Sequence, residues 1–150
     1  MDKSLAADFN ADYQVSLGDY VVFEEGAKEY LESLKGKYRL IAVTNGTKVA
    51  QEKKLRTSEL DKVFDAVYIS EDIGIEKPNK GYFDRVFAEE GLLDLSEAII
   101  IGDSLTSDIL GGNNAGIDTC WYNPSGNIND KDVSVTYEVR KVSEVAKILS

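Results

Sequence analysis

The chain has 150 residues, a length that fits one domain with a sizeable hydrophobic core. Its net charge of −10 leaves no basic surface for a nucleic-acid polymer and argues against an anionic membrane surface as a partner. The chain contains no histidine, which excludes histidine general bases, Ser-His and Cys-His catalytic pairs and His-Zn sites. Carboxylates, lysine, hydroxyls, backbone amides or a metal must therefore carry any chemistry.

Cysteine content and hydropathy give two further expectations. Cys120 is the single cysteine and lies in an apolar run up to Tyr122, so we predict a small core residue and no intramolecular disulfide. No segment approaches the length of a membrane span, and no N-terminal apolar segment resembles a signal peptide. We therefore expect a cytoplasmic location.

Residues 1–22 differ in pattern from the rest of the chain. We predict an appended helix there, because apolar residues recur at spacings compatible with one helical face: Leu5, Ala6, Phe9 and Tyr13. Residues 19–23 are interpreted as an entry loop.

From about residue 24 onward, predicted helices and strands alternate. Helices are expected at 27–34, 48–57, around 83–87, after 107 and at 142–149. Strands are expected at 40–43, 64–69, 98–101 and 119–122. This alternation predicts an α/β fold with a mostly parallel sheet and right-handed crossovers.

The stretch from Ile99 to Asp108 is the most informative in the chain. Three isoleucines predict a strand buried on both faces, which ends at Gly102 and is followed by two carboxylates, Asp103 and Asp108. Ligand sites of open α/β sheets lie at the carboxyl ends of strands, and hard oxygen ligands there suit Mg²⁺. The alternative is that Asp103 is a turn residue and Asp108 a solvated helix residue.

A second candidate site follows the predicted strand 40–43. Thr44 offers a hydroxyl, and Asn45 and Gly46 add backbone amides in a tight turn that leads to a helix N-terminus. Such a turn is suited to bind an anion. The alternative is a turn in which the Thr44 hydroxyl only caps the helix.

A third candidate is Lys77. Pro78 follows it and fixes the backbone, which aims the lysine side chain. A positioned ammonium in an acidic protein is suited to neutralise a phosphoryl group and nearby carboxylates. The alternative is a surface lysine before a helix that begins at the proline.

Together, these segments resemble the haloacid dehalogenase (HAD) superfamily from about Phe23 to the C-terminus. Thr44-Asn45-Gly46 is similar to the second family motif, Lys77-Pro78-Asn79 to the third, and Gly102-Asp103-Ser104 through Asp108 to the fourth. Residues 70–79 and 108–116 are most similar to bacterial pyrimidine 5′-nucleotidases. The resemblance implies a three-layer Rossmann-like core.

The resemblance also implies a Mg²⁺-dependent phosphatase that hydrolyses small phosphate monoesters, nucleoside monophosphates included, through an aspartyl-phosphate. Thr44 would bind a phosphoryl oxygen beside Asn45, and Lys77 would hold the phosphate and orient the nucleophile. Asp103 would bind Mg²⁺ directly, and Asp108 would bind it through water or fix Lys77. The Gly-Asp-Ser start of the fourth motif favours a phosphatase over a dehalogenase, which needs no metal.

The first family motif, Asp-x-Asp-x-Thr at the end of an apolar strand, is absent from the sequence. The nearest segment, Asp8-Phe9-Asn10-Ala11-Asp12, has a different spacing, no threonine, and only Leu5-Ala6-Ala7 before it. By the resemblance, 1–22 is the remnant of a helical cap with its linker, and 23–150 is a core without its central nucleophile strand. We therefore expect a C-terminal portion of a longer enzyme, inactive alone: a subunit of a split enzyme, a shortened gene product or an engineered piece.

In this family the nucleophile strand lies between the strands that end at Thr44 and Asp103. A gap there would leave unpaired backbone groups and open apolar edges. We expect the chain to close it by direct pairing, with its own N-terminal segment, as a homodimer, or with an N-terminal subunit that carries the first motif. The alternative function is a non-catalytic phosphate- or metal-binding or interaction module.

Overall fold

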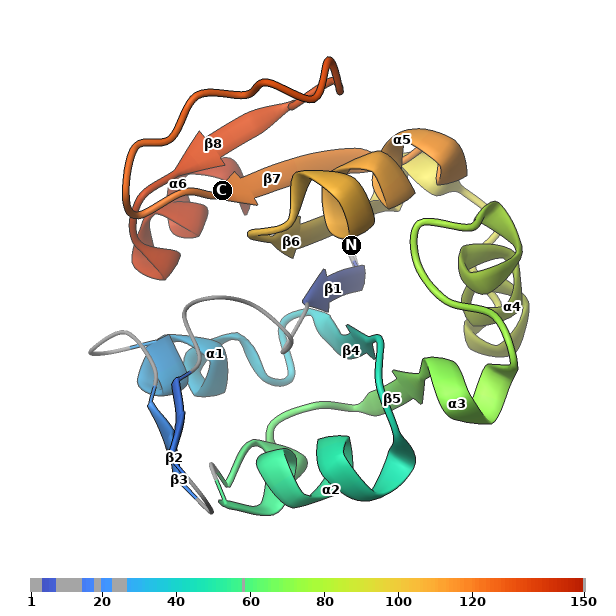
Figure 1. Cartoon of the computed structure of the whole chain (residues 1–150), viewed down its shortest axis with the longest axis vertical. Helices are drawn as coiled ribbons and strands as arrows, with labels where there is room; N and C mark the ends of the chain where they lie inside the picture. Colours follow the sequence, from blue (N-terminus) through green and yellow to red (C-terminus); the bar gives the residue numbers. More distant parts are fainter. Residues whose placement is uncertain (1–3, 8–14, 18–19, 23–26, 58, 150) are drawn as a thin grey trace.

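A computed structural model describes residues 4–7, 15–17, 20–22, 27–57 and 59–149. Six parallel strands form one sheet in the order β5-β4-β1-β6-β7-β8 (Figure 1). Their bounds are β1 Ser4–Ala7, β4 Arg39–Thr44, β5 Ala66–Ile69, β6 Ala98–Gly102, β7 Asp118–Tyr122 and β8 Tyr137–Val139. A separate antiparallel hairpin joins β2 (Val15–Leu17) to β3 (Tyr20–Val22).

Helices cover both faces of the sheet. One face carries α1 (Ala27–Leu34), α2 (Lys48–Thr57) and α6 (Ala146–Leu149), and the other carries α4 (Lys80–Glu90) and α5 (Leu110–Ala115). The short α3 (Ser70–Ile73) follows β5 directly. Single helical turns lie at Leu60–Lys62, Leu95–Glu97 and Val142–Val145, and a π-helical turn lies at Leu105–Ile109.

Two hydrophobic clusters hold these layers together. In β4, Leu40 and Ala42 belong to the cluster under α1 and α2, whereas Ile41 and Val43 belong to the cluster under α4. This division follows from the alternation of side chains along a strand that is buried on both faces. The predicted three-layer α/β fold with a parallel sheet is confirmed.

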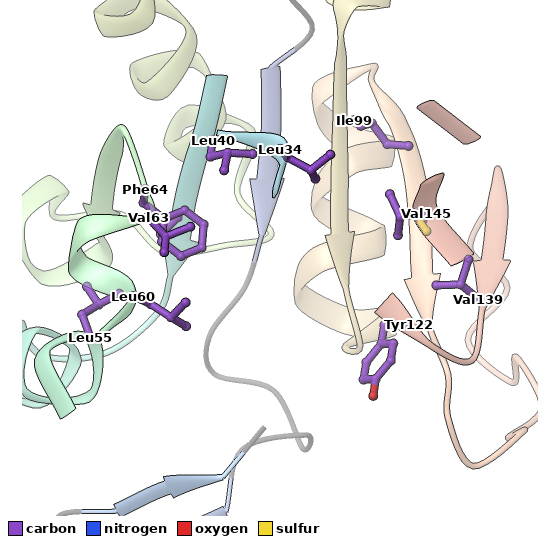
Figure 2. Packing of buried hydrophobic residues seen from close by; sticks show 12 residues of the cluster. Leu34, Leu40, Leu55, Leu60, Val63, Phe64, Ile99, Tyr122, Val139 and Val145 are labelled. Atoms are coloured by element: carbon purple, nitrogen blue, oxygen red, sulfur yellow. The ribbon is translucent and has the colours of Figure 1, made fainter. Parts of the chain in front are cut away.

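The N-terminal segment differs from the prediction. Ser4–Ala7 is not helical but forms β1, which pairs in parallel with both β4 and β6. Figure 2 shows β1 running between the buried side chains around β4 and those around β6 to β8. The gap between β4 and β6 is therefore closed by the chain's own N-terminal segment, which is one of the four expected ways. Satisfying the backbone groups of two apolar neighbouring strands outweighs the weak helical pattern of so short a segment.

The rest of the expected helix lies partly outside the described residues. Residues 15–17 are a strand, which again differs from a helix, and 20–22 are a strand where an entry loop was expected. Residues 8–14, with the Asp8–Asp12 segment, are outside the described part of the chain. The assignment of 1–22 to a cap remnant and of 23–150 to the core stays a prediction.

Between residues 27 and 149, the predicted elements are present with shifted ends. β5 begins at Ala66 because Phe64, predicted in the strand, packs into the core after the turn Leu60–Lys62. The helical segment predicted after 107 begins three residues earlier, at Leu105. The sequence analysis did not predict α3 or β8, both of which have four residues or fewer.

Two general expectations can be compared with the structure. Cys120 is buried in the core as predicted, and burial raises the pKa of its thiol to about 12. In the described ranges, no helix is both long and apolar enough to cross a membrane. The cytoplasmic location stays a prediction.

The register of β1 shows which residues meet at the carboxyl edge of the sheet. Ala7 lies opposite Ala42 on one side and Ile101 on the other. Thr44 and Asp103 each follow these partners by two residues, so parallel pairing brings the two predicted site segments to one edge.

Candidate functional site

The centre of the candidate site is an ion pair between Lys77 and Asp108. Lys77 Nζ lies 2.7 Å from Asp108 Oδ1, and both side chains are 0 % exposed. The ammonium also donates a hydrogen bond to the Val43 carbonyl oxygen at 3.1 Å, which ties it to the end of β4. Desolvation offsets much of the attraction within such a pair, so it is weak evidence for stability and marks a candidate functional position.

Asp108 is held by a local structure that requires a glycine. A Cβ atom added to Gly102 would lie 2.2 Å from Asp108 Oδ2, so no larger residue fits at the end of β6. The Ser104 N–H donates to the same oxygen at 3.2 Å. The alternative that Asp108 is a solvated helix residue is therefore wrong. Asp108 Oδ1 accepts a hydrogen bond from Lys77 Nζ, and the expected role of fixing Lys77 stays a prediction.

Thr44 is fully buried at the end of β4. Its N–H donates to the Tyr82 hydroxyl at 3.0 Å, and that hydroxyl donates to the Tyr68 carbonyl oxygen at 2.6 Å. The Thr44 hydroxyl donates to Gln51 Oε1 at 3.2 Å. The alternative that Thr44 only caps α2 is wrong, because the hydroxyl that caps this helix belongs to Thr47.

The Asn45 side chain joins two loops. Its Oδ1 accepts from the Lys77 N–H at 2.9 Å, and its Nδ2 donates to the Lys77 carbonyl oxygen at 3.1 Å. The peptide bond between Lys77 and Pro78 is cis. Asn45 therefore fixes the backbone of the residue whose ammonium reaches Asp108.

The predicted anion site at the start of α2 is already engaged by protein groups. The Gly46 N–H donates to Ser70 Oγ at 2.9 Å, and the Lys48 N–H donates to Glu71 Oε1 at 3.1 Å. A carboxylate is a favourable partner for a helix N-terminus. In this structure, Glu71 takes the place that the sequence analysis expected for a bound anion.

Asp103 lies at the end of β6 and is partly exposed. Its carbonyl oxygen accepts a hydrogen bond from Trp121 Nε1 at 3.0 Å, and the residue borders a depression that is open to solvent. The alternative of a turn residue remains compatible with this position. The structure thus brings Thr44, Asn45 and Lys77 together with Asp108, and places Asp103 at the same sheet edge.

The residues present fit Mg²⁺ in part. Mg²⁺ retains several waters and takes one or two protein carboxylates together with substrate phosphate oxygens. Asp103 offers such a carboxylate, whereas both oxygens of Asp108 accept hydrogen bonds from Lys77 and Ser104. Among the described residues, no group of three or more acidic, histidine or cysteine side chains is arranged to hold a metal. Asp103 would therefore hold the ion with water and substrate oxygens.

The sequence analysis missed four residues that fix the loop after β4: Gln51, Ser70, Glu71 and Tyr82. Gln51 is 4 % exposed although it lies in a polar helix, and its Nε2 donates to the Asn45 carbonyl oxygen at 3.3 Å. A Cβ atom on Gly46 would lie 2.5 Å from that nitrogen. A polar residue on the inner face of a predicted helix is the signal that would have identified Gln51.

Known proteins share this architecture. A family model described as haloacid dehalogenase-like hydrolase matches residues 2–122. YfnB of Bacillus subtilis (strain 168) is 43 % identical over 126 residues, which cover 84 % of this chain and 54 % of YfnB. A crystal structure of YfnB bound to magnesium matches with a TM-score of 0.82 and 42 % identity, over 86 % of this chain and 57 % of that one.

Two further relatives bear on function and length. Pyrimidine 5′-nucleotidase YjjG of Escherichia coli (strain K12) is 36 % identical over 124 residues, or 83 % of this chain and 55 % of YjjG. A crystal structure of an uncharacterised protein from Listeria monocytogenes serotype 4b matches with a TM-score of 0.80 and 25 % identity, over 98 % of this chain and 96 % of that one.

The chain spans about half the length of the curated relatives YfnB and YjjG. The family model nevertheless covers most of the chain, from before β1 to the end of β7. The chain belongs to the family of haloacid dehalogenase-like hydrolases.

Proposed function

We propose that this chain carries the phosphoryl- and metal-binding part of a Mg²⁺-dependent phosphatase. Its substrates are small phosphate monoesters, nucleoside monophosphates among them. The observation that carries the proposal is the enclosed Lys77–Asp108 pair, which is tied to the end of β4 beside Thr44. The nucleotidase relative YjjG supports the substrate class, and the magnesium in the YfnB crystal structure supports the metal.

Each site residue has one task in this proposal. The Thr44 hydroxyl donates a hydrogen bond to a phosphoryl oxygen, and the Lys77 ammonium neutralises the charge that develops there. Asp108 holds the ammonium in place through its 2.7 Å contact. Asp103 would hold Mg²⁺, which when bound screens the negative charges of the reacting groups.

Access to these groups requires a rearrangement. Thr44, Lys77 and Asp108 are buried in this structure, so a phosphoryl group reaches them only after neighbouring parts of the chain move away. The contacts of the loop after β4 with Gln51 Nε2, at the Asn45 carbonyl oxygen, and with Ser70 keep that loop ordered while access opens, whereas the Thr44 hydroxyl exchanges Gln51 Oε1 for a phosphoryl oxygen.

The attacking group in this proposal is an aspartate supplied by polypeptide outside this chain, because the sequence lacks the Asp-x-Asp-x-Thr motif. One of its carboxylate oxygens bonds to phosphorus while the bond from phosphorus to the substrate alcohol oxygen breaks. The second aspartate of the same supplied motif, two residues further on, donates a proton to the leaving alcohol oxygen, and water then hydrolyses the aspartyl-phosphate, which releases phosphate and restores the carboxylate. The strand that carries this aspartate would take the place of β1 between β4 and β6.

The test is release of p-nitrophenol from p-nitrophenyl phosphate with Mg²⁺. The chain is assayed alone and together with a polypeptide that ends an apolar strand in Asp-x-Asp-x-Thr and continues through a helical cap. We expect turnover only from the mixture. Asp103→Asn in the mixture lowers kcat about a hundredfold or more, as for loss of a transition-state contact, whereas the exposed Asp84→Asn leaves kcat unchanged.

Two results would reject parts of this proposal. Turnover by the chain alone that disappears in Asp8→Asn would place the nucleophile in this chain. A well-folded mixture without any turnover would favour the non-catalytic binding module.

A further inference from the structure

The helical turn that carries Asp108 continues directly into α5. The π-helical turn ends at Ile109 and α5 begins at Leu110, so Asp108 and α5 belong to one continuous helical segment. Near the end of this segment, Asn114 Nδ2 donates a hydrogen bond to the Pro78 carbonyl oxygen at 2.9 Å. One helical segment therefore holds the Lys77–Pro78 segment at two separate points.

The two points fix different parts of Lys77. Asp108 Oδ1 binds the end of the side chain, at Nζ. Asn114 binds the backbone one residue further on, at the Pro78 carbonyl oxygen. Asn45 binds the N–H and the carbonyl oxygen of Lys77 itself. The backbone around Lys77 is thus held from the loop after β4 and from α5, which prevents it from pivoting about the ion pair with Asp108.

Close packing of α5 brings Asn114 within reach of Pro78. A Cβ atom added to Gly111 would lie 2.6 Å from Phe83 Cε2 on α4 and 3.5 Å from Pro78 Cα. A Cβ atom added to Gly112 would lie 2.5 Å from Thr119 Cγ2 on β7. Larger residues at these two positions would push α5 away from α4 and the sheet. The short distance from Asn114 to Pro78 depends on this close approach.

The neighbouring Asn113 provides a comparison within the same helix. Its Nδ2 donates to the Ser134 carbonyl oxygen at 2.9 Å, and its Oδ1 accepts from the Ser134 N–H at 2.9 Å. These bonds fasten the loop before β8. Both asparagines therefore bind a loop backbone through their side chains, but only the contact of Asn114 leads to the residue next to Lys77.

We propose that Asn114 is a positioning residue for the Lys77 ammonium. The inference rests on the proposed function, in which this ammonium neutralises the charge that develops on the phosphoryl group. Neighbouring parts of the chain move away before substrate enters, and the Asn114 contact keeps Lys77 and Asp108 in one arrangement during that movement. A displacement of about 1 Å can lower a rate about a hundredfold. Because the charge is largest in the transition state, loss of the contact lowers kcat more than it changes KM.

The test compares Asn114→Ala with Asn113→Ala. Alanine is the most favourable residue in a helix, so both variants retain α5. In the chain alone, hydrogen exchange of the Lys77 amide is expected to be about tenfold faster in Asn114→Ala, because a neighbouring anchor is lost. Asn113→Ala leaves this exchange rate unchanged. Asn114→Gln, which retains the amide donor, restores most of the protection.

The second measurement uses the mixture with the polypeptide that carries the Asp-x-Asp-x-Thr strand. With p-nitrophenyl phosphate and Mg²⁺, Asn114→Ala lowers kcat about tenfold at nearly constant KM. Asn113→Ala leaves both constants unchanged, and Asn114→Gln restores most of kcat. A merely structural contact would not separate kcat from KM in this way.

Three results decide the matter. Unchanged exchange of the Lys77 amide in Asn114→Ala, or equal effects of the two alanine variants, would overturn the inference. Faster exchange with an unchanged kcat would overturn it as well, because the contact would then be structural only. An inactive mixture with the unsubstituted chain would reject the proposed function, and the exchange rates would then decide whether Asn114 positions Lys77.

Discussion

Strand β4 has an ion pair near each end, and the two pairs differ in their exposure to solvent. At the carboxyl end, Lys77 and Asp108 are both 0 % exposed. At the amino end, Arg39 pairs with Glu90, and their side chains are 47 % and 6 % exposed. An exposed cation retains most of its hydration, whereas the Lys77 ammonium has exchanged all of it for protein partners.

The amino-end pair has the features of a structural contact. Glu90 accepts hydrogen bonds from Arg39 and from the Tyr68 hydroxyl. Burial alone would raise the pKa of Glu90, but the hydrogen bonds from Arg39 and Tyr68 outweigh it and lower the pKa below its ordinary value. Burial, followed by the bond to Glu90, raises the pKa of Tyr68. The charges of Arg39 and Glu90 therefore neutralise each other, the Tyr68 hydroxyl stays protonated, and the three side chains fasten α4 to the sheet.

The carboxyl-end pair is costly in desolvation and lies where parallel sheets place their ligand sites. In the proposed function, the Lys77–Asp108 pair serves phosphoryl chemistry, whereas the Arg39–Glu90 pair serves stability. This interpretation predicts different responses to substitution at the two ends of the strand.

The largest effect is expected for Asp108→Asn. Lys77 would then be buried without a counter-ion, which destabilises a fold by about 3–5 kcal/mol. Urea unfolding at pH 7 measures the change in the free energy of unfolding. The matched control is Asp84→Asn, because Asp84 pairs with Lys80 on the surface of α4 and such pairs contribute about 0.3–0.5 kcal/mol. Equal losses in both variants would contradict the interpretation.

Removal of both charges is expected to leave the free energy of unfolding unchanged or to raise it. In Lys77→Met/Asp108→Leu no unpaired charge remains, and such replacements are neutral or stabilise by about 1–4 kcal/mol. Urea unfolding at pH 7 measures the free energy of unfolding of the double variant. A double variant as unstable as Asp108→Asn would mean that the pair itself stabilises the fold.

A smaller effect is expected for Tyr82→Phe. The change removes the hydroxyl that connects the Thr44 N–H with the Tyr68 carbonyl oxygen. Leaving buried polar groups without a partner costs about 1–3 kcal/mol. The control is Tyr137→Phe, at a tyrosine that is 40 % exposed. If the two variants unfold at the same urea concentration, the Tyr82 hydroxyl has no role in holding Thr44.

Glu90→Gln tests the amino-end pair and its pH dependence. Because Arg39 is half exposed, we expect a loss of only about 1 kcal/mol at pH 7. The lowered pKa means that the stabilisation is present above the ordinary glutamate pKa and is lost as pH falls through the lowered one. Urea unfolding from pH 7 to pH 3 should show the difference between wild type and variant shrinking. A constant difference would contradict the pKa direction.

The sequence predicted those parts of the molecule that depend on periodicity and chain order. The helix at 48–57 has the predicted ends, and Thr44 and Asp103 lie at the same edge of the sheet because parallel strands end there. The sequence did not predict β1, whose conformation depends on the gap between two distant strands. It also missed Gln51 and Tyr82, because their roles depend on side-chain directions that arise only when α2 and α4 pack on the sheet.

The contrast between the two ends of β4 can be tested in one spectrum. The central claim is that the carboxyl end, and not the amino end, binds a phosphoryl group. A ¹H–¹⁵N titration of the labelled chain, mixed with the polypeptide that supplies the Asp-x-Asp-x-Thr strand, with orthophosphate and Mg²⁺ should shift the amides of Thr44, Asn45, Gly46 and Lys77, leave Arg39 unchanged, and lose the effect in Thr44→Val. Unchanged amides at 44–46, or shifts confined to the Arg39 end, would contradict the account.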